Sequence, residues 1–186
     1  MAVENEPASN ATIEQMPTIN FKGKALVQNF HLLVPYHELK PVKSKSLTEK
    51  VSLHDNLVVH GDNLKALKSL LPYYHGKVKC IYIDPPYNSG ARDWKYNNNY
   101  IDKADPFRHS KWLSMLRKRL IIAKRLMNPA DSVLIITIDE KECHHLGMLL
   151  EQEFPEGAIQ MVSTLINPAN VAREGGFGRN DEYIFL

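Results

Sequence analysis

Short apolar runs alternate with segments of helical period from residue 57 onward, and this alternation limits the possible folds more than any other feature. The runs cover residues 57–60, 78–83, 132–138 and about 158–166. Strands that alternate with helices in this way are typical of a mostly parallel sheet. The run at 132–138 is continuously apolar, which indicates a central strand buried on both faces. The sequence therefore predicts an α/β fold.

The segments between these runs have the apolar spacing of helices. The first should end at Pro72, and one of its faces carries Leu64, Leu67 and Leu71. The second should run from about residue 107 to 127, and the third from about 140 to 154. The predicted buried stripe of the second helix consists of Trp112, Leu116, Leu120, Ala123 and Met127. Residues 183–186 have the pattern of a last strand.

The composition is that of a globular protein with one core. The chain has 186 residues, of which 44% are hydrophobic and 24% are charged, so a single main domain is expected. Residues 1–20 are polar and without period, and we predict a disordered tail there. Residues 21–53 are predicted to form an N-terminal extension that packs on the main body, which spans residues 54–186.

The charge and the cysteines exclude several classes of protein. The formal net charge of +2 is too small to predict nucleic-acid binding by itself, so any such affinity must come from local patches. Cys80 and Cys143 have no CxxC partner, and we expect both to be reduced and buried. No secretory h-region and no run of about 18 apolar residues is present, so we expect no membrane contact and a cytoplasmic location.

The tetrapeptide Asp84-Pro85-Pro86-Tyr87 follows the apolar run at 78–83 directly. Such a string would arise by chance in roughly one chain in a thousand of this length. A loop at the carboxyl end of a strand is the usual ligand position in α/β folds. Pro85 pushes Asp84 into an extended conformation, and Pro86 has a fixed φ and no N–H, so the loop is stiff before any ligand arrives. We predict that it is the catalytic site.

Such a turn suits methyl transfer to an exocyclic amino group of a nucleobase. That nitrogen is a poor nucleophile because its lone pair is delocalised into the ring. The Asp84 carboxylate and the Pro85 carbonyl would accept both amino hydrogens and so localise the lone pair. Tyr87 offers an aromatic face to an extruded base, and such stacking is worth about 1–3 kcal/mol. The implied methyl donor is S-adenosylmethionine.

A structural alternative is a stiff turn with a buried tyrosine and no chemistry. No metal is expected, because methyl transfer needs none and the sequence has no HExxH pattern. His144 and His145 are adjacent, so on a helix they diverge by about 100° and cannot both face one ion.

Two groups of cations have different interpretations. A solvated helix face is the preferred interpretation of Arg117, Lys118, Lys124 and Arg125. The loop after the turn mixes cations with stacking and hydrogen-bonding groups, and we predict that it contacts nucleic acid through Asn88, Arg92, Lys95 and Tyr96.

Several ordered blocks of the sequence match one known family, at residues 56–64, 82–90, 95–97, 112–113 with 119–120, 136–140 and 181–184. From about residue 21 to 186, the chain resembles the N-terminal part of β-class DNA amino-methyltransferases. It is similar in particular to the modification subunits of type III restriction systems and to site-specific adenine methylases.

The resemblance implies a Rossmann-like methyltransferase sheet, S-adenosylmethionine as methyl donor and adenine N6 in DNA as acceptor. It gives Asp84, Pro85, Pro86 and Tyr87 the catalytic and base-binding roles. Asp62 and Asp84 would contact the cofactor. The implied partners are DNA and either a restriction subunit or a second copy of the chain.

The sequence departs from the family pattern in one respect. The family has a phenylalanine- and glycine-rich cofactor loop after a target-recognition region, and neither is found in this chain. Its one glycine cluster, at 175–178, opens no helix and is interpreted as a flexible connection. We therefore expect residues 54–186 to be an incomplete catalytic region, truncated at its C-terminus. The alternatives are a non-catalytic DNA-binding or assembly fragment of this fold, and a methyltransferase that acts on cytosine N4 or on RNA.

Overall fold

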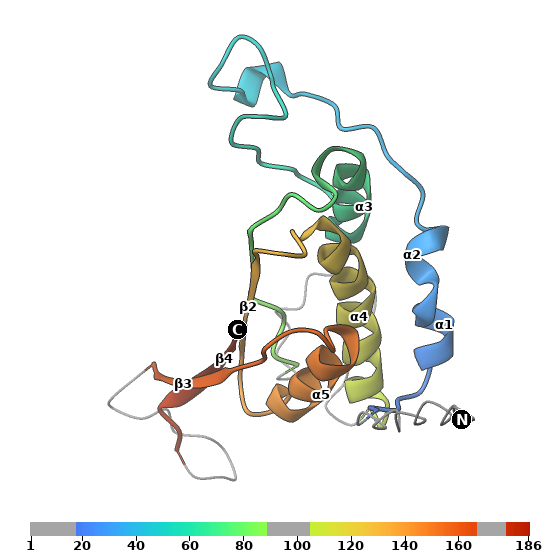
Figure 1. Cartoon of the computed structure of the whole chain (residues 1–186), viewed down its shortest axis with the longest axis vertical. Helices are drawn as coiled ribbons and strands as arrows, with labels where there is room; N and C mark the ends of the chain where they lie inside the picture. Colours follow the sequence, from blue (N-terminus) through green and yellow to red (C-terminus); the bar gives the residue numbers. More distant parts are fainter. Residues whose placement is uncertain (1–17, 89–104, 167–177) are drawn as a thin grey trace, which may run out of the picture.

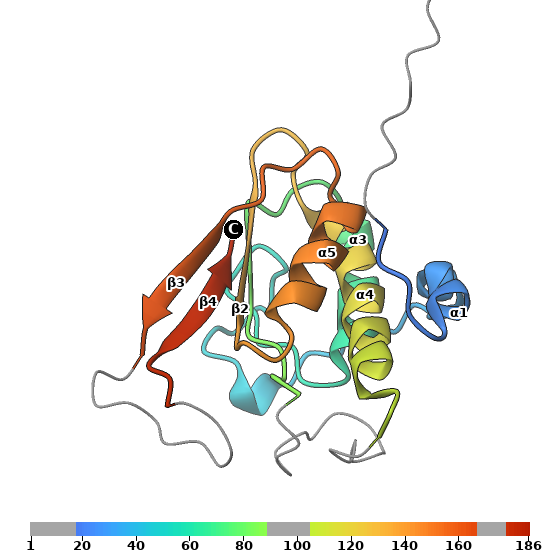
Figure 2. The ribbon, with the colours of Figure 1, turned by 90° about the horizontal axis from the view of Figure 1, so that it is seen from below.

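The computed structural model of the protein describes residues 18–88, 105–166 and 178–186. Within these residues, a four-stranded sheet packs against helices on one of its faces (Figure 1; Figure 2). The strands are β1 (Cys80–Ile83), β2 (Val133–Ile138), β3 (Met161–Leu165) and β4 (Asp181–Phe185). The predicted combination of strands and helices in one α/β fold is therefore present.

The sheet has the strand order β1-β2-β4-β3 and is mixed. β1 and β2 are parallel, whereas β4 is antiparallel to both β2 and β3. The prediction of a mostly parallel sheet is therefore wrong for the described residues. The register pairs Leu165 with Asp181, so β3 ends beside the start of β4 as in a hairpin, and a hairpin connection produces antiparallel pairing.

The strand predicted at residues 57–60 is not formed. This segment pairs with no strand in the part of the chain that the structure describes, and the side chain of Val58 is fully exposed. A strand needs a partner for its backbone N–H and C=O groups. β1 is the edge strand of the sheet, and residues 57–60 do not pair with it.

The three predicted helices are confirmed as α3 (Asn63–Tyr74), α4 (Arg108–Leu126) and α5 (Cys143–Glu153). α3 begins after Asp62, whose side chain caps it by accepting a 3.0 Å hydrogen bond from the backbone N–H of Lys65. The prediction that α3 ends at Pro72 is wrong, because Pro72 lies inside the last turn of the helix. A proline so close to the helix end removes only one late hydrogen bond, so the helix continues to Tyr74.

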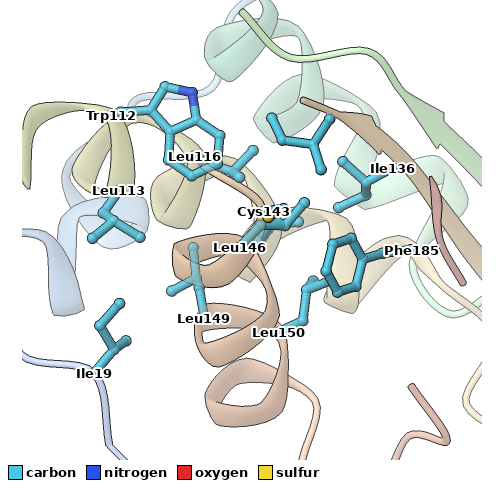
Figure 3. Close-up of a cluster of buried hydrophobic side chains, with 12 residues drawn as sticks. Ile19, Trp112, Leu113, Leu116, Ile136, Cys143, Leu146, Leu149, Leu150 and Phe185 are labelled. Atoms are coloured by element: carbon cyan, nitrogen blue, oxygen red, sulfur yellow. The ribbon is translucent and has the colours of Figure 1, made fainter. Parts of the chain in front are cut away.

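α4 lies at the centre of the packing, and its predicted buried stripe is confirmed except for Met127, which is partly exposed. Trp112 and Leu120 are completely buried. The main core joins this helix to β2, β4 and α5 (Figure 3). Its other buried members include Leu113, Leu116, Ile136, Ile138, Leu146, Leu149 and Phe185.

Among the described residues, helices cover only one face of the sheet (Figure 2). Side chains alternate along a strand, so Ile136 and Ile138 of β2 are buried while Val133 is 39% exposed. The prediction that this strand is buried on both faces is therefore wrong for the described residues. Cys80 was also predicted to be buried, but it is exposed because it lies on the edge strand β1.

The N-terminal segment packs on α4. Its elements are α1 (Lys24–Gln28), α2 (Phe30–Leu33) and the 3-10 helix η1 (Lys43–Lys45), and the first two lie beside α4 (Figure 1). The prediction of a solvated face is wrong for Arg117 of α4, which is buried. Its Nε lies 2.6 Å from Glu153 Oε1, with which it forms an ion pair. Lys118 lies 3.8 Å from the ring centroid of Phe30. No helix in the described ranges is long and apolar enough to cross a membrane.

Replacement of Leu120 by Ala should lower the free energy of unfolding by about 2–5 kcal/mol, because the completely buried side chain leaves a cavity in a packed core. Urea denaturation followed by circular dichroism measures this change. Leu47→Ala is the control, since Leu47 is fully exposed and should change stability by less than about 0.5 kcal/mol. Equal losses in the two variants would contradict the core described here.

Candidate functional site

The segment from Asp84 to Asn88 leaves the carboxyl end of β1 and is fixed by hydrogen bonds to several elements. The first fixed point is Asp84, whose side chain is exposed. Thr137 Oγ1 donates a 2.7 Å hydrogen bond to Asp84 Oδ1. The parallel register pairs Ile83 with Ile136, so the next residue on each strand lies side by side. Among the described residues, Asp84 Oδ2 has no hydrogen bond and can accept one from a ligand.

The second fixed point is Pro86. The indole Nε1–H of Trp112 donates a 2.6 Å hydrogen bond to the Pro86 carbonyl. Trp112 is completely buried in the core, so its N–H has a fixed direction. The preceding carbonyl, that of Pro85, has no partner within the part of the chain that the structure describes. Of the two predicted acceptors, Asp84 is exposed to a ligand, whereas Pro85 is buried.

The third fixed point is Tyr87, which is partly buried. Its hydroxyl donates a 3.1 Å hydrogen bond to Glu182 Oε2 on β4. Burial, together with the negative charges of Asp84 and Glu182, raises the pKa of Tyr87 well above its usual value against an opposing hydrogen bond from Thr137. The hydroxyl therefore stays protonated and keeps donating to Glu182.

The fourth fixed point is Asn88, which has a left-handed backbone with φ of 56°. Asparagine tolerates this conformation better than most residues. The Asn88 side chain is buried, and its Nδ2–H donates to Glu142 Oε1. In this structure Asn88, predicted to contact nucleic acid, therefore faces Glu142 rather than solvent.

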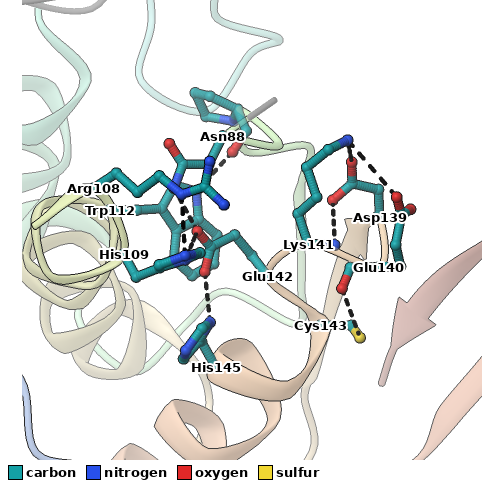
Figure 4. Close-up of polar contacts among 11 residues, drawn as sticks. Asn88, Arg108, His109, Trp112, Asp139, Glu140, Lys141, Glu142, Cys143 and His145 are labelled. Atoms are coloured by element: carbon teal, nitrogen blue, oxygen red, sulfur yellow. Dashed lines mark hydrogen bonds and ion pairs between the residues drawn. The ribbon is translucent and has the colours of Figure 1, made fainter. Parts of the chain in front are cut away.

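Glu142 precedes α5 and is the centre of a buried polar cluster (Figure 4). His109 Nδ1 lies 2.7 Å from Glu142 Oε1. The neighbouring Arg108 donates from Nε to His109 Nε2 at 3.1 Å, so this nitrogen accepts and the proton of a neutral His109 is on Nδ1. His109 thus donates to the same carboxylate as Asn88.

His145 approaches the other oxygen of the same carboxylate. Its Nδ1 lies 2.8 Å from Glu142 Oε2, which is an ion pair when His145 is protonated, and neither atom has another hydrogen-bond partner among the described residues. The ring centroids of His109 and His145 are 4.7 Å apart. Contact with Glu142 raises the pKa of His145 against the effect of burial. Burial favours a higher pKa for Glu142, but its histidine and Asn88 contacts outweigh this and lower it.

The predicted residues differ in where they lie. Asp84, Pro85, Pro86 and Tyr87 form one turn, whereas Asp62 caps α3 and no hydrogen bond joins it to that turn in the described ranges. Arg92, Lys95 and Tyr96 lie outside the described residues. Two cavities, of about 310 and 350 Å³, are lined by other parts of the chain and not by the turn.

Sequence reasoning missed the residues that hold the turn. Trp112, Thr137 and Glu182 lie inside blocks that match the resembled family, which was a usable signal. Trp112 was predicted only as a core residue, and the side chains of Thr137 and Glu182 were given no role. Nothing in the sequence indicated that His109 and Glu142 are neighbours, because 33 residues separate them in the chain. Only the packing of α4 on α5 brings them together.

Comparison with known proteins finds one matching family model and several relatives. Residues 78–186 match the model of a protein family described as DNA methylase. The chain is 31% identical to the type III restriction-modification enzyme EcoPI Mod subunit of Escherichia phage P1, over 91% of this chain and 30% of that protein. It is 38% identical to the probable type III restriction-modification enzyme HindVI Mod subunit of Haemophilus influenzae, over 71% of this chain and 18% of that protein.

A further relative is the type II methyltransferase M.KpnI of Klebsiella pneumoniae, which is 30% identical over 67% of this chain and 30% of that protein. The chain thus spans less than a third of the length of each of these three relatives.

The cluster around Glu142 should make stability depend on pH. The lowered pKa of Glu142 contributes stability above its usual value of 4.5, and this is lost as the pH falls through the folded-state pKa. The raised pKa of His145 contributes stability below its usual value of 6.5, and this is lost as the pH rises through the folded-state pKa. Both contributions are present together between these two values.

We therefore expect His145→Asn to destabilise the protein most near pH 5.5 and progressively less at alkaline pH. Unfolding free energies of the variant and the wild type at several pH values measure the difference. The neighbouring His144 is exposed, so His144→Asn should show no such trend. A pH-independent effect of His145→Asn would contradict the ion pair with Glu142.

Proposed function

The chain belongs to the DNA methylase family, and from this membership we propose that it carries the acceptor side of the active site of a DNA methyltransferase. The reaction would transfer a methyl group from S-adenosylmethionine to N6 of adenine. The observation that supports this proposal best is the turn from Asp84 to Asn88. Four side-chain contacts hold it, and within the described residues one oxygen of the exposed Asp84 and the carbonyl of the buried Pro85 have no hydrogen-bond partner.

These two acceptors would activate the adenine amino group. Thr137 occupies Asp84 Oδ1, which leaves Oδ2 for one N6 hydrogen, and Trp112 occupies the Pro86 carbonyl, which leaves that of Pro85 for the other. Two hydrogen bonds of this kind pull N6 toward tetrahedral geometry and direct its lone pair at the methyl carbon. As the N–C bond forms, the C–S electron pair goes to sulfur. Asp84 stabilises the positive charge on N6 until one proton leaves to the carboxylate or to water.

Tyr87 would hold the base during this step. The hydrogen bond to Glu182 fixes the hydroxyl end of the ring, so the ring has one preferred orientation. Stacking of an extruded base on such a ring recovers part of the cost of unpairing it, about 1–3 kcal/mol. An adenine that lies flat on Tyr87 would present its amino edge to the two acceptors on the same turn.

S-adenosylmethionine is the cofactor that the family implies, and its role when bound is to supply the methyl group. Asp62 and Asp84 are the residues proposed to hold it. Both carboxylates are exposed. The oxygen of Asp62 that has no hydrogen bond in the described part of the chain suits a sugar hydroxyl. Asp84, whose Oδ2 would accept from N6, would attract the positively charged sulfonium group through its negative charge, so the donor chemistry fits.

We also propose that the sheet is part of a Rossmann-like methyltransferase fold. The open edge of β1 and the uncovered face of the sheet, within the described residues, leave room for the further strands and helices of such a fold. By analogy with the type III restriction-modification Mod subunits that it resembles, the protein would act on DNA in a restriction-modification system. A restriction subunit or a second copy of the chain would be its protein partner.

Replacement of Asp84 by Ala should reduce methylation by about 10²-fold or more, because it removes an acceptor that acts on the transition state. The test expresses the protein that contains this chain in a bacterial host without N6-methyladenine and quantifies the nucleosides of its DNA by mass spectrometry. Asp131→Ala is the matched control, since Asp131 is an exposed carboxylate paired with Lys79 and should leave methylation unchanged.

The products also decide between the other hypotheses. N4-methylcytosine in place of N6-methyladenine would contradict the adenine assignment, and methylation confined to RNA would contradict DNA as substrate. DNA binding by a wild-type protein that methylates no nucleic acid would support the non-catalytic interpretation. Undiminished methylation by Asp84→Ala would overturn the role of the turn.

Replacement of Thr137 by Val should lower turnover by about 3- to 10-fold, because it removes one hydrogen bond that orients Asp84 while it keeps the shape of the side chain. Steady-state kinetics on DNA that contains the target site measures the change. Thr164→Val on β3 makes the same chemical change at another strand position and should have no effect on turnover. If both variants turn over at the wild-type rate, Thr137 has no part in positioning Asp84.

A further inference from the structure

Three side chains of the kind that bind transition metals meet where α4 and α5 begin. They are His109, Glu142 and His145, and one ligand atom from each lies within 4.8 Å of the other two (Figure 4). We propose that they bind one divalent transition-metal ion, for which Zn²⁺ is the best fit. Metal binding by this triad rests on its own geometry and not on the proposed methyl transfer.

The burial of Glu142 is the first reason. Its side chain is completely buried, and a buried carboxylate is costly unless a cation or hydrogen bonds compensate it. Oε1 is compensated by hydrogen bonds, because Asn88 and His109 both donate to it. Oε2 is buried and has no hydrogen-bond partner among the described residues. The carboxylate thus has one hydrogen-bonded oxygen, and the other oxygen has no described contact of this kind except the 2.8 Å ion pair with His145 Nδ1.

The geometry of His145 is the second reason. Its Nδ1 is also buried without a hydrogen-bond partner in the described ranges, although it is only 2.8 Å from Glu142 Oε2. In the ion pair, a proton on His145 lies between these two atoms. When His145 is neutral, neither atom has a hydrogen bond among the described residues. A single ion placed to accept both lone pairs would satisfy the two atoms together. Around a tetrahedral Zn²⁺, neighbouring ligand atoms are about 3.3 Å apart. The two contacts to Glu142, at 2.7 and 2.8 Å, would need to lengthen, and all three ligand atoms already lie within 4.8 Å of one another.

The ligand types select the class of metal. Two imidazole nitrogens and one carboxylate oxygen suit Zn²⁺ and similar first-row ions, whereas Mg²⁺ and Ca²⁺ prefer ligand sets made only of oxygen. Three protein ligands leave a fourth position for water. Glu142 also holds Asn88, so the ion would link α4, α5 and the Asp84–Asn88 turn. Its role would be to position the turn.

Arg108 competes with the metal for His109. Its Nε donates to His109 Nε2, which keeps the imidazole proton on Nδ1. An ion at Nδ1 requires the proton to be on Nε2, where it would face the Arg108 donor, and the guanidinium charge would also repel the ion. Removal of the Arg108 side chain should therefore tighten metal binding. A cluster that is only structural predicts no such gain.

The test is calorimetric titration of the untagged, chelator-treated chain with Zn²⁺. We expect one ion per chain with a dissociation constant of about 10 µM or below, and His145→Ala should weaken it by about tenfold or more. His144→Ala, at the adjacent exposed histidine, should bind as the wild type does. Arg108→Ala should bind up to about tenfold more tightly, which corresponds to the loss of one competing hydrogen bond.

Three outcomes would overturn the proposal: no stoichiometric uptake of Zn²⁺ by the wild type, equal affinities in His145→Ala and His144→Ala, or weaker binding by Arg108→Ala. Circular dichroism of each variant shows whether it folds, and the gain expected for Arg108→Ala cannot arise from misfolding. Replacement of Zn²⁺ by Co²⁺ provides a second readout, because a tetrahedral Co²⁺ site absorbs visible light. Absorption that is unchanged by His145→Ala would likewise count against the triad.

Discussion

The hydrogen bond from Trp112 to the Pro86 carbonyl joins the hydrophobic core to the candidate site. The indole is completely buried among residues of α4, α5 and the sheet, so its N–H cannot turn away to water. The packing of the core thereby fixes the direction of a carbonyl in the turn, in which the Asp84 side chain is exposed. Two consecutive prolines stiffen the same turn from within. A ligand that binds here meets acceptors whose directions are already set, which is the condition for efficient positioning.

The contacts that hold the turn come from two strands of the sheet and from the start of a helix. Thr137 contributes from the neighbouring parallel strand, Glu182 from the antiparallel strand beyond it, and Glu142 from the start of α5. Each holds a different residue of the turn, so no single contact bears the whole constraint. The mixed strand order is essential to this arrangement, because it places β4 beside β2 and so brings Glu182 to Tyr87.

The same packing creates the buried cluster behind the turn. α4 and α5 begin at the same end of the molecule, and the polar residues of their first turns converge on Glu142. A carboxylate in this position must be compensated locally, because burial removes it from water. Asn88 and His109 donate hydrogen bonds to one of its oxygens. The other oxygen would face a protonated His145 in a purely structural cluster and a metal ion in a metal site.

The sequence by itself determined the α/β class, the three main helices and the turn after β1, because apolar periodicity and proline chemistry act over short distances. It could not determine strand pairing: residues 57–60 have the composition of a strand but no pairing, and β4 runs antiparallel to β2. Nor could it place Thr137, Glu142 or Glu182 around the turn. These depend on which surfaces pack together, and such contacts join residues far apart in the chain. Local pattern specifies each element, and only the tertiary structure decides its neighbours.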